Sequence, residues 1–418
     1  TSPMVSTNDW DTIFNYYVQS APEIQPPQDP RPEIQVGMKY FRAERPKYRR
    51  ENPSTTLVKA SPATGRIYMG DEATKSLDIL NLDTSLAETL PMNNVPIAVT
   101  ETPKGIYVSS IGHFQPSEDP KAELVFLSRG ANHFELPQRI VGPLPRVTGM
   151  EFADLNGDGK IDFVLCIYGN NVGRFSWFEN LGNDQYEEHE LLPKSGAIRA
   201  EIHDLNGDGF PDIAVLQAQE SESFYIFIND GKGHFTAHTI FQKPPIMGHT
   251  YFEMADFNHD GKLDFLVTNG DNGEYPSPVK KYHGIRIYLN RGDLNFDEAY
   301  FFPMNGVFKA MARDFDGDGD LDIAAISFFP DYQKSPEESF VYLENQGNLR
   351  FTASTFPECI MGRWLTMDVA DLDGDGDLDI VLGSFIHGPS AVPAEYMRNW
   401  ETLGPSVLVL RNQLREPK

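Results

Sequence analysis

The strongest constraint on the fold is an acidic nine-residue segment that the chain repeats five times. The copies read DLNGDGKID, DLNGDGFPD, DFNHDGKLD, DFDGDGDLD and DLDGDGDLD, and they begin at Asp154, Asp204, Asp256, Asp314 and Asp371. One copy follows another every 50 to 58 residues. The sequence therefore predicts an architecture of repeated structural units.

Each copy is followed by the same succession of strand-like segments. An apolar strand comes directly after the last Asp, as in FVLCIY, IAVLQA and IVLGSF. The next strand, the third of the unit, ends in Asn or Asp. A Gly-containing turn then leads to an aromatic residue and the fourth strand. Four strands per unit, joined by short turns, are typical of one blade of a β-propeller.

Counting these units predicts an all-β, seven-bladed β-propeller. Five units with the acidic motif fill residues 150–418, and residues 55–150 contain two further strand-rich periods without it. The spacing by itself leaves six or eight blades open. Because the last unit lacks its fourth strand, we expect residues 37–45 (GMKYFRAER) to supply it and close the ring.

The N-terminal residues 1–36 differ in kind from the repeats. Trp10, Phe14 and Tyr17 recur at helical spacing after a possible N-cap at Ser6 or Thr7. The proline-rich stretch APEIQPPQDPRPEI cannot continue that helix. We therefore divide the chain into a helix with a proline-rich linker at 1–36 and the propeller at 37–418.

The acidic loop has the composition of a site for a hard divalent cation. It places Asp or Asn at positions 1, 3, 5 and 9, a Gly at position 6 that permits a sharp turn, and a backbone carbonyl at position 7. This oxygen-only set suits calcium, whereas magnesium demands stricter geometry and retains its waters. We expect about five calcium ions, against the alternative of acidic turns without metal.

An EF-hand is the obvious rival for such a loop. An EF-hand needs Glu at position 12 and flanking helices. Position 12 is Leu165, Val215, Val267, Ala325 or Leu382, each inside an apolar strand. The loop is therefore expected to join two strands.

These repeats resemble the FG-GAP/VCBS repeats, whose calcium loops also occur in the integrin α-subunit propeller. The resemblance covers roughly residues 100–415, and His259 departs from it by replacing a Gly. The calcium ligands that the resemblance implies, with position 7 acting through its carbonyl, are Asp154, Asn156, Asp158, Lys160 and Asp162; Asp204, Asn206, Asp208, Phe210 and Asp212; Asp256, Asn258, Asp260, Lys262 and Asp264; Asp314, Asp316, Asp318, Asp320 and Asp322; and Asp371, Asp373, Asp375, Asp377 and Asp379.

A second resemblance concerns the N-terminal helix. SPMVSTNDWDTIFNYYVQSAPE is similar to the last helix of small c-type cytochrome domains, which precede such propellers in some bacterial proteins. Haem attachment needs CxxCH, which this sequence lacks, so we expect no haem in this chain and read Met4 as a loop residue.

Partner binding is expected on the face opposite the calcium loops. The connections between second and third strands vary in length there and are rich in aromatic and charged residues. The candidate binding residues are Asp271, Tyr275, Tyr282, His283, Tyr332, Arg363, Trp364, His387, Tyr396 and Trp400.

Charge and motif content narrow the function classes. The formal charge of −26 argues against nucleic acid, and we find no transmembrane segment and no catalytic motif. We expect a non-catalytic, calcium-stabilised, extracytoplasmic interaction subunit of a bacterial cell-envelope assembly. Its partners would be envelope or secreted proteins, or a glycan, and membrane association would come through a complex or an upstream lipid anchor.

Two alternatives stay open. One is an extracellular polysaccharide-active enzyme at the propeller mouth, and the other is an accessory domain of a c-type cytochrome protein. A cluster of converging carboxylates in a deep pocket would favour the enzyme. An upstream CxxCH would favour the cytochrome protein.

Overall fold

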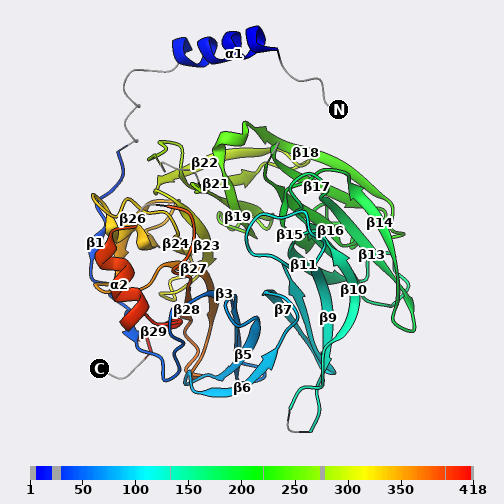
Figure 1. The fold of residues 1–418 in the computed structure, drawn as a ribbon, viewed down its shortest axis with the longest axis horizontal. Coiled ribbons are helices and arrows are strands. Elements are labelled where there is room, and N and C mark those ends of the chain that lie inside the picture. The colour runs from blue at the N-terminus through cyan, green and yellow to red at the C-terminus, as the bar shows by residue number, and fades with distance from the viewer. Residues whose placement is uncertain are drawn as a thin grey trace.

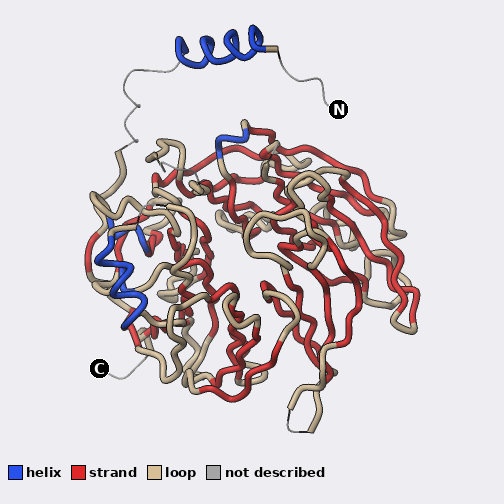
Figure 2. The backbone as a smooth tube through the Cα atoms, viewed as in Figure 1, coloured by secondary structure: helices blue, strands red, loops and turns tan. Residues whose placement is uncertain are grey.

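The computed structural model describes residues 6–20, 30–131, 133–219, 221–273, 278–390 and 392–415. In these residues the strands form seven sheets. Figure 1 shows the sheets arranged as blades around a common centre, with the first strand of each blade innermost. Figure 2 shows that strand dominates the disc. The seven-bladed β-propeller predicted from the repeats is confirmed.

The first four blades are built from consecutive strands. Blade 1 contains β3 (Thr55–Ser61), β4 (Arg66–Asp71), β5 (Ser76–Asn81) and β6 (Leu86–Pro91). Blade 2 contains β7 (Pro96–Thr102), β8 (Gly105–Ser110), β9 (Ala122–Ser128) and β10 (Gln138–Leu144). Blade 3 contains β11 (Val147–Ala153), β12 (Asp162–Ile167), β13 (Arg174–Gly182) and β14 (Gln185–Leu192). Blade 4 contains β15 (Ala197–His203), β16 (Asp212–Gln217), β17 (Glu222–Asn229) and β18 (Phe235–Lys243).

Blade 5 is also built from consecutive strands, whereas blades 6 and 7 each include a strand from the N-terminal segment. Blade 5 contains β19 (His249–Ala255), β20 (Asp264–Asn269), β21 (Gly284–Asn290) and β22 (Phe296–Pro303). Blade 6 contains β23 (Val307–Arg313), β24 (Asp322–Ser327), β25 (Phe340–Asn345) and β26 (Phe351–Thr355), with β1 (Gln35–Val36) as a fifth strand. Blade 7 contains β27 (Trp364–Ala370), β28 (Asp379–Ser384), β29 (Val407–Asn412) and β2 (Phe41–Glu44).

The core lies between neighbouring blades. Every residue of the second strands β12, β16, β20, β24 and β28 is buried, because each of these strands is covered on both faces. One apolar cluster joins Val164 and Trp177 of blade 3 to Val215 and Phe227 of blade 4. The continuous apolar runs that follow each acidic loop are therefore what hold adjacent blades together.

An N-terminal strand closes the ring, as the sequence predicted. β2 pairs antiparallel with β29, from Phe41 opposite Asn412 to Glu44 opposite Val409. The Phe41 ring is 7% exposed and packs edge-on against Phe315 and Tyr342. The fourth strand of blade 7 thus comes from the other end of the propeller, which removes an exposed sheet edge.

The residues before β2 also belong to the propeller. β1 runs parallel to β26, with Gln35 opposite Ser354, and Ile34 is buried in the core of blades 5 and 6. Arg31 forms an ion pair with the fully buried Glu338. The linker predicted to extend to residue 36 therefore contacts the propeller from Arg31 onward.

Two α-helices lie in the described ranges, along with three short 3-10 segments, η1 (Pro245–Met247), η2 (Pro336–Ser339) and η3 (Cys359–Met361). The predicted N-terminal helix is α1 (Thr7–Ser20), and the hydroxyl of Ser6 accepts the backbone N–H of Asp9 at 3.2 Å. The second, α2 (Ala394–Leu403), lies in the connection between β28 and β29. None of the described helices combines the length and apolarity needed to cross a bilayer.

Candidate functional site

The five acidic loops all join the first strand of a blade to the second. They occupy the turns β11–β12, β15–β16, β19–β20, β23–β24 and β27–β28. Because successive strands in a blade are antiparallel, these turns share one side of the disc. We call this side the calcium-loop face, after the ion that the sequence predicts there. The connections from second to third strands lie on the other side, here called the opposite face.

Hydrogen bonds hold each loop in the same conformation. In the first loop, the Asp154 carboxylate accepts the backbone N–H groups of Gly157 at 2.8 Å and Gly159 at 2.9 Å. The side-chain oxygen of Asn156 accepts the N–H of Asp158 at 3.1 Å. The position-1 carboxylate makes the bond to the position-6 glycine in all five loops. The side-chain oxygens at positions 1, 3 and 5 are thus oriented by the backbone of their own loop.

The Asp at position 9 ties each loop to the third strand of its blade. Asp162 accepts the N–H of Leu155 at 3.1 Å on one oxygen and that of Asn180 at 2.7 Å on the other. The equivalent pair of bonds recurs at the other four position-9 residues, Asp212, Asp264, Asp322 and Asp379. All five side chains are buried, which explains why this position is always Asp beside an apolar strand.

Burial makes these carboxylates reluctant to ionise. It raises the pKa of Asp322 to about 7 and that of Asp379 to about 6, and it raises the pKa values of Asp162, Asp212 and Asp264 as well. A cation next to the loop would oppose this effect, because a nearby positive charge favours the ionised carboxylate.

The donor set fits a hard cation. In the fourth loop, carboxylate oxygens of Asp314, Asp316 and Asp318 lie within 4.8 Å of one another, and the fifth loop has the same arrangement. In the fifth loop, an oxygen of Asp375 and one of Asp377 are also buried without a hydrogen-bond partner. Close, unpaired carboxylate oxygens repel each other unless a cation or proton lies among them.

Backbone conformation explains the invariant glycine at position 6. Its φ angle is between 83° and 97° in the five loops, a region that L-residues rarely adopt. His259, at position 4 of the third loop, has φ 58°, where its counterparts are glycines. This value lies in the ordinary left-handed region, which explains how a histidine is accommodated there.

Substituting the position-6 glycine tests this conformational requirement. We expect Gly319→Ala to destabilise the chain by about 1–3 kcal/mol, although an added methyl would meet no atom within 4 Å. The loss would come from the φ angle of 97° alone. Urea unfolding in excess calcium measures it, and His259→Ala should lie near the parent because its φ angle suits other residues. Equal stability of Gly319→Ala and the parent would contradict the explanation.

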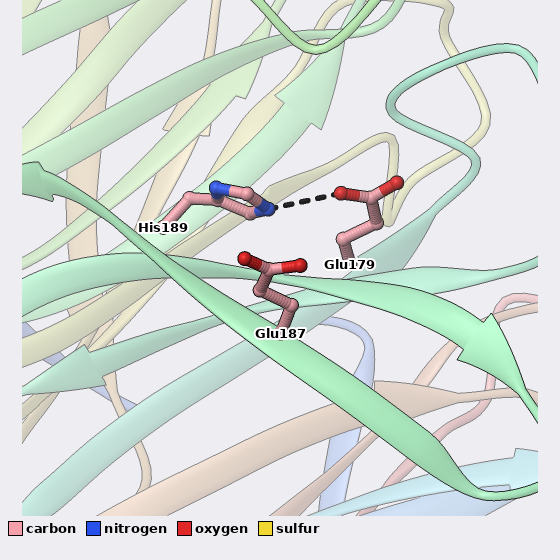
Figure 3. A group of neighbouring side chains, drawn as sticks. All are labelled: Glu179, Glu187 and His189. Carbon is pink, nitrogen blue, oxygen red and sulfur yellow. Dashed lines mark hydrogen bonds and ion pairs between the residues drawn. The ribbon is translucent and has the colours of Figure 1, made fainter.

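A histidine-carboxylate cluster lies beside the first loop. Glu179 of β13 and Glu187 of β14 are directly opposite each other, and His189 Nε2 lies 2.9 Å from Glu179 Oε2 (Figure 3). Glu179 also accepts a hydrogen bond from the Asn156 amide at 3.0 Å. The His189 ring stacks on Trp177 with centroids 4.5 Å apart. The cluster thus anchors Asn156 to the third strand of its blade.

The opposite face places the predicted binding residues at two separate cavities. Asp271 and His387 line a central cavity of about 1060 Å³, whereas His283 and Tyr332 line a second cavity of about 350 Å³. Tyr396 packs against Tyr332 with ring centroids 5.5 Å apart, and Tyr282 is half-buried. Tyr275 lies outside the described residues.

Three of the predicted binding residues are structural. Trp364 and Trp400 are fully buried, and their indole N–H groups each donate to a backbone carbonyl at 2.7 Å, those of Cys359 and Ile360. Arg363 is 1% exposed and its guanidinium lies 3.7 Å from the Phe328 ring centroid. The expectation that these side chains are exposed to a partner is wrong, because contacts within the chain bury all three. Local sequence patterns do not reveal this burial. Trp400 of α2, for example, contacts Ile360 of η3, which lies 40 residues earlier in the chain.

Charged side chains from the first strands line the central cavity. Carboxylates of one blade accept backbone N–H groups of another, as Glu253 does from Ala312 at 3.0 Å and Asp368 from Ala60 at 2.8 Å. Burial lowers the pKa of Lys309 to about 8, and its ammonium donates to the Met367 carbonyl at 2.6 Å. These bonds join neighbouring blades around the centre. The Glu253 and Asp368 carboxylates are therefore engaged between blades and do not form the free converging cluster that would favour the enzyme alternative.

Comparisons with known proteins agree with this architecture. A family model of the FG-GAP-like repeat matches residues 154–215, 204–267 and 314–382, segments that each begin at the first Asp of a loop. A T-cell immunomodulatory protein homolog of Plasmodium yoelii yoelii is 26% identical in an alignment of 218 residues that covers 43% of this chain and 30% of that protein. The match thus spans less than a third of that relative.

Solved structures with similar folds are very different in sequence. The crystal structure of BBS1N in complex with ARL6DN has a TM-score of 0.54 and 11% identity, covering 91% of this chain and 97% of that chain. The structure of Saccharomyces cerevisiae Sqt1 has a TM-score of 0.51 and 9% identity, covering 91% and 99%. At such low identity the likeness concerns the fold alone.

Proposed function

We propose that this chain, a seven-bladed β-propeller with FG-GAP-like repeats, is a non-catalytic interaction module that calcium stabilises and that works outside the cytoplasm. The observation that carries the proposal is the set of five backbone-locked acidic loops on one face. An extracytoplasmic setting accords with it, because calcium sites of modest affinity need the millimolar calcium found outside cells. The repeats do not single out a bacterial source, since one relative is from Plasmodium.

The ligands proposed for each ion come from the loop itself. In the first loop they are the side chains of Asp154, Asn156, Asp158 and Asp162 and the carbonyl of Lys160, and the other loops contribute the equivalent residues. Bound calcium would neutralise the clustered carboxylates and crosslink two strands of a blade. The chain's own contribution is to pre-orient these oxygens through the backbone hydrogen bonds described above.

Calcium titration tests the proposal directly. Isothermal titration of the metal-free chain should give about five calcium ions per chain, and metal analysis of calcium-loaded protein should give the same number. Magnesium at equal concentration should bind far more weakly, because it demands near-ideal octahedral geometry and gives up its bound water reluctantly. No calcium uptake, or equal uptake of magnesium, would refute the calcium assignment.

The raised pKa values predict a pH dependence. In the metal-free protein, Asp322 and Asp379 hold protons more tightly when folded than when unfolded, so metal-free stability falls as pH rises from about 4 to about 7. Calcium competes with these protons. We therefore expect the calcium-induced rise in melting temperature to be larger at about pH 7.5 than at about pH 5.5. Thermal unfolding with EDTA at each pH is the control, and equal rises would contradict the prediction.

We place the interaction surface on the opposite face. The connections there vary in length, and they expose Ile246, Lys281 and Arg398. The calcium-loop face has uniform loops that suit support better than recognition. We expect the partners of this acidic chain to be secreted or cell-surface proteins, or a glycan. Nucleic acid is not expected among them, because it carries negative charge like the chain itself.

Paired sets of substitutions locate the interaction surface. One set combines Ile246→Asp, Lys281→Glu and Arg398→Glu on the opposite face. The other combines Lys160→Glu and Lys262→Glu on the calcium-loop face. In affinity capture from an extracytoplasmic fraction, only the first set should abolish partner recovery. Loss with the second set alone would move the surface to the calcium-loop face.

A further inference from the structure

The smaller cavity on the opposite face has the features of a built binding site. Its volume of about 350 Å³ falls in the range of small-molecule sites. Loops from blades 5, 6 and 7 enclose it, and it is separate from the central cavity. Its lining includes Asn272, His283, Asn305, Phe329, Asp331 and Tyr332.

Three buried polar atoms in this lining have no hydrogen-bond partner. They are Oδ1 of Asn272, Nε2 of His283 and Oδ1 of Asn305. The three side chains are 5%, 1% and 5% exposed. Buried polar atoms are almost always paired, so three unpaired ones around one cavity indicate that something polar is meant to meet them.

The hydrogen bonds of the two amides decide which of their atoms is left over. The Asn305 amide nitrogen donates to both carboxylate oxygens of Glu338, at 3.1 and 2.8 Å. The Asn272 amide nitrogen donates to the Pro278 carbonyl at 2.9 Å. A flip of either amide would break these bonds, so both present an oxygen, and a ligand must offer donors to them.

The charge around the cavity distinguishes between kinds of donor. Lys334 and Asp331 line the cavity with opposite charges. Burial lowers the pKa of His283 to about 3, and the nearby Lys280 and Arg286 contribute to the shift. A lining that carries one charge of each sign suits a neutral ligand that both donates and accepts hydrogen bonds. Hydroxyl groups can donate to the amide oxygens and accept from a lysine, and the rings of Phe329 and Tyr332 provide apolar surface for a ligand's C–H face.

We infer that this cavity binds a neutral, polyhydroxylated ligand of about monosaccharide size, such as a pyranose. The binding residues would be Asn272, Asn305 and His283 for the hydroxyls, with Tyr332 and Phe329 as the apolar wall. This inference is independent of calcium binding, because it rests on other residues and on the opposite face. A negative result for calcium binding would therefore not contradict ligand binding in this cavity, and a negative result for the ligand would not contradict calcium binding.

Ligand-observed saturation-transfer NMR on the full, calcium-saturated chain tests the inference. The probes are methyl β-D-glucopyranoside, methyl α-D-mannopyranoside, methyl α-L-rhamnopyranoside and glycerol, with ethylammonium and methylguanidinium as the opposing class. At least one pyranoside should bind, and neither cation should. Binding of the cations alone, or of no probe, would overturn the inference.

Two variants connect binding to this cavity. His283→Phe keeps a ring but removes the unpaired nitrogen, and Asn272→Leu removes an unpaired oxygen. Each should weaken binding of the pyranoside at least tenfold, whereas His238→Phe, on the exposed strand β18, should leave the Kd unchanged. Thermal unfolding checks that the variants fold. Unchanged binding in both folded variants would overturn the assignment.

A crystal of the parent protein soaked in the bound glycoside gives a readout that needs no variant. Density between the loops of Asn272, Asn305 and Tyr332 would support the inference. Density only elsewhere would overturn it, even if a pyranoside binds in solution.

Discussion

EDTA is expected to lower the melting temperature of the calcium-loaded chain by about 10–20 °C. Each ion bound at about a hundred times its dissociation constant contributes about 2.7 kcal/mol to the free energy of unfolding, and there are five loops. The formal charge of the chain is −26. Five calcium ions, one in each acidic loop, would add ten positive charges where carboxylates lie close together. Differential scanning calorimetry with EDTA and with restored calcium measures the effect.

Single substitutions separate the loops from general charge effects. Asp318→Ala, in the fourth loop, should cost roughly a fifth of the EDTA effect and reduce the calcium count by one. Asp297→Ala changes the charge equally but lies on an exposed strand, where its ion pair with Arg291 is worth little. If the EDTA-treated chain melts at the same temperature as the calcium-loaded chain, the prediction that calcium stabilises the fold is wrong.

Removing the N-terminal segment that closes the ring should have the second large effect. A chain lacking residues 1–45 loses β2 and β1, exposes the edge of β29 and uncovers the pockets of Ile34 and Phe41. Burial of those two side chains alone is worth roughly 3–6 kcal/mol. We expect this chain to aggregate or to melt at least about 10 °C lower.

A shorter deletion provides the matched control. A chain lacking residues 1–29 keeps Arg31, Ile34, β1 and β2, so its melting temperature should equal that of the parent. Thermal unfolding and size-exclusion chromatography compare the two. If the chain lacking residues 1–45 stays monomeric and equally stable, closure by β2 does not contribute to stability.

Point variants on the same segment refine this comparison. Phe41→Ala should cost about 3–5 kcal/mol, because it leaves a cavity against Phe315 and Tyr342. Val36→Ala, only five residues earlier, should cost little because Val36 is 67% exposed. If Phe41→Ala and Val36→Ala lose similar amounts of stability, burial of the Phe41 side chain does not explain the loss.

Local sequence signals are sufficient to predict the repeated part of the fold. Strand alternation, turn glycines and the spacing of the acidic loops are local signals, and they recur five times, so errors in one copy are corrected by the others. They placed each loop between two strands of a blade. The missing fourth strand of the last repeat also pointed to residues 37–45, where β2 was found.

The composition of the opposite face depends on contacts between segments that are distant in the sequence. Trp364, Trp400 and Arg363 look like exposed binding residues in sequence, but contacts within the chain bury all three. Whether an aromatic or charged side chain in a long connection faces solvent depends on contacts with distant segments, which local periodicity does not encode. The same holds for the cavity of Asn272, His283 and Asn305, whose unpaired atoms come together from connections in different parts of the chain.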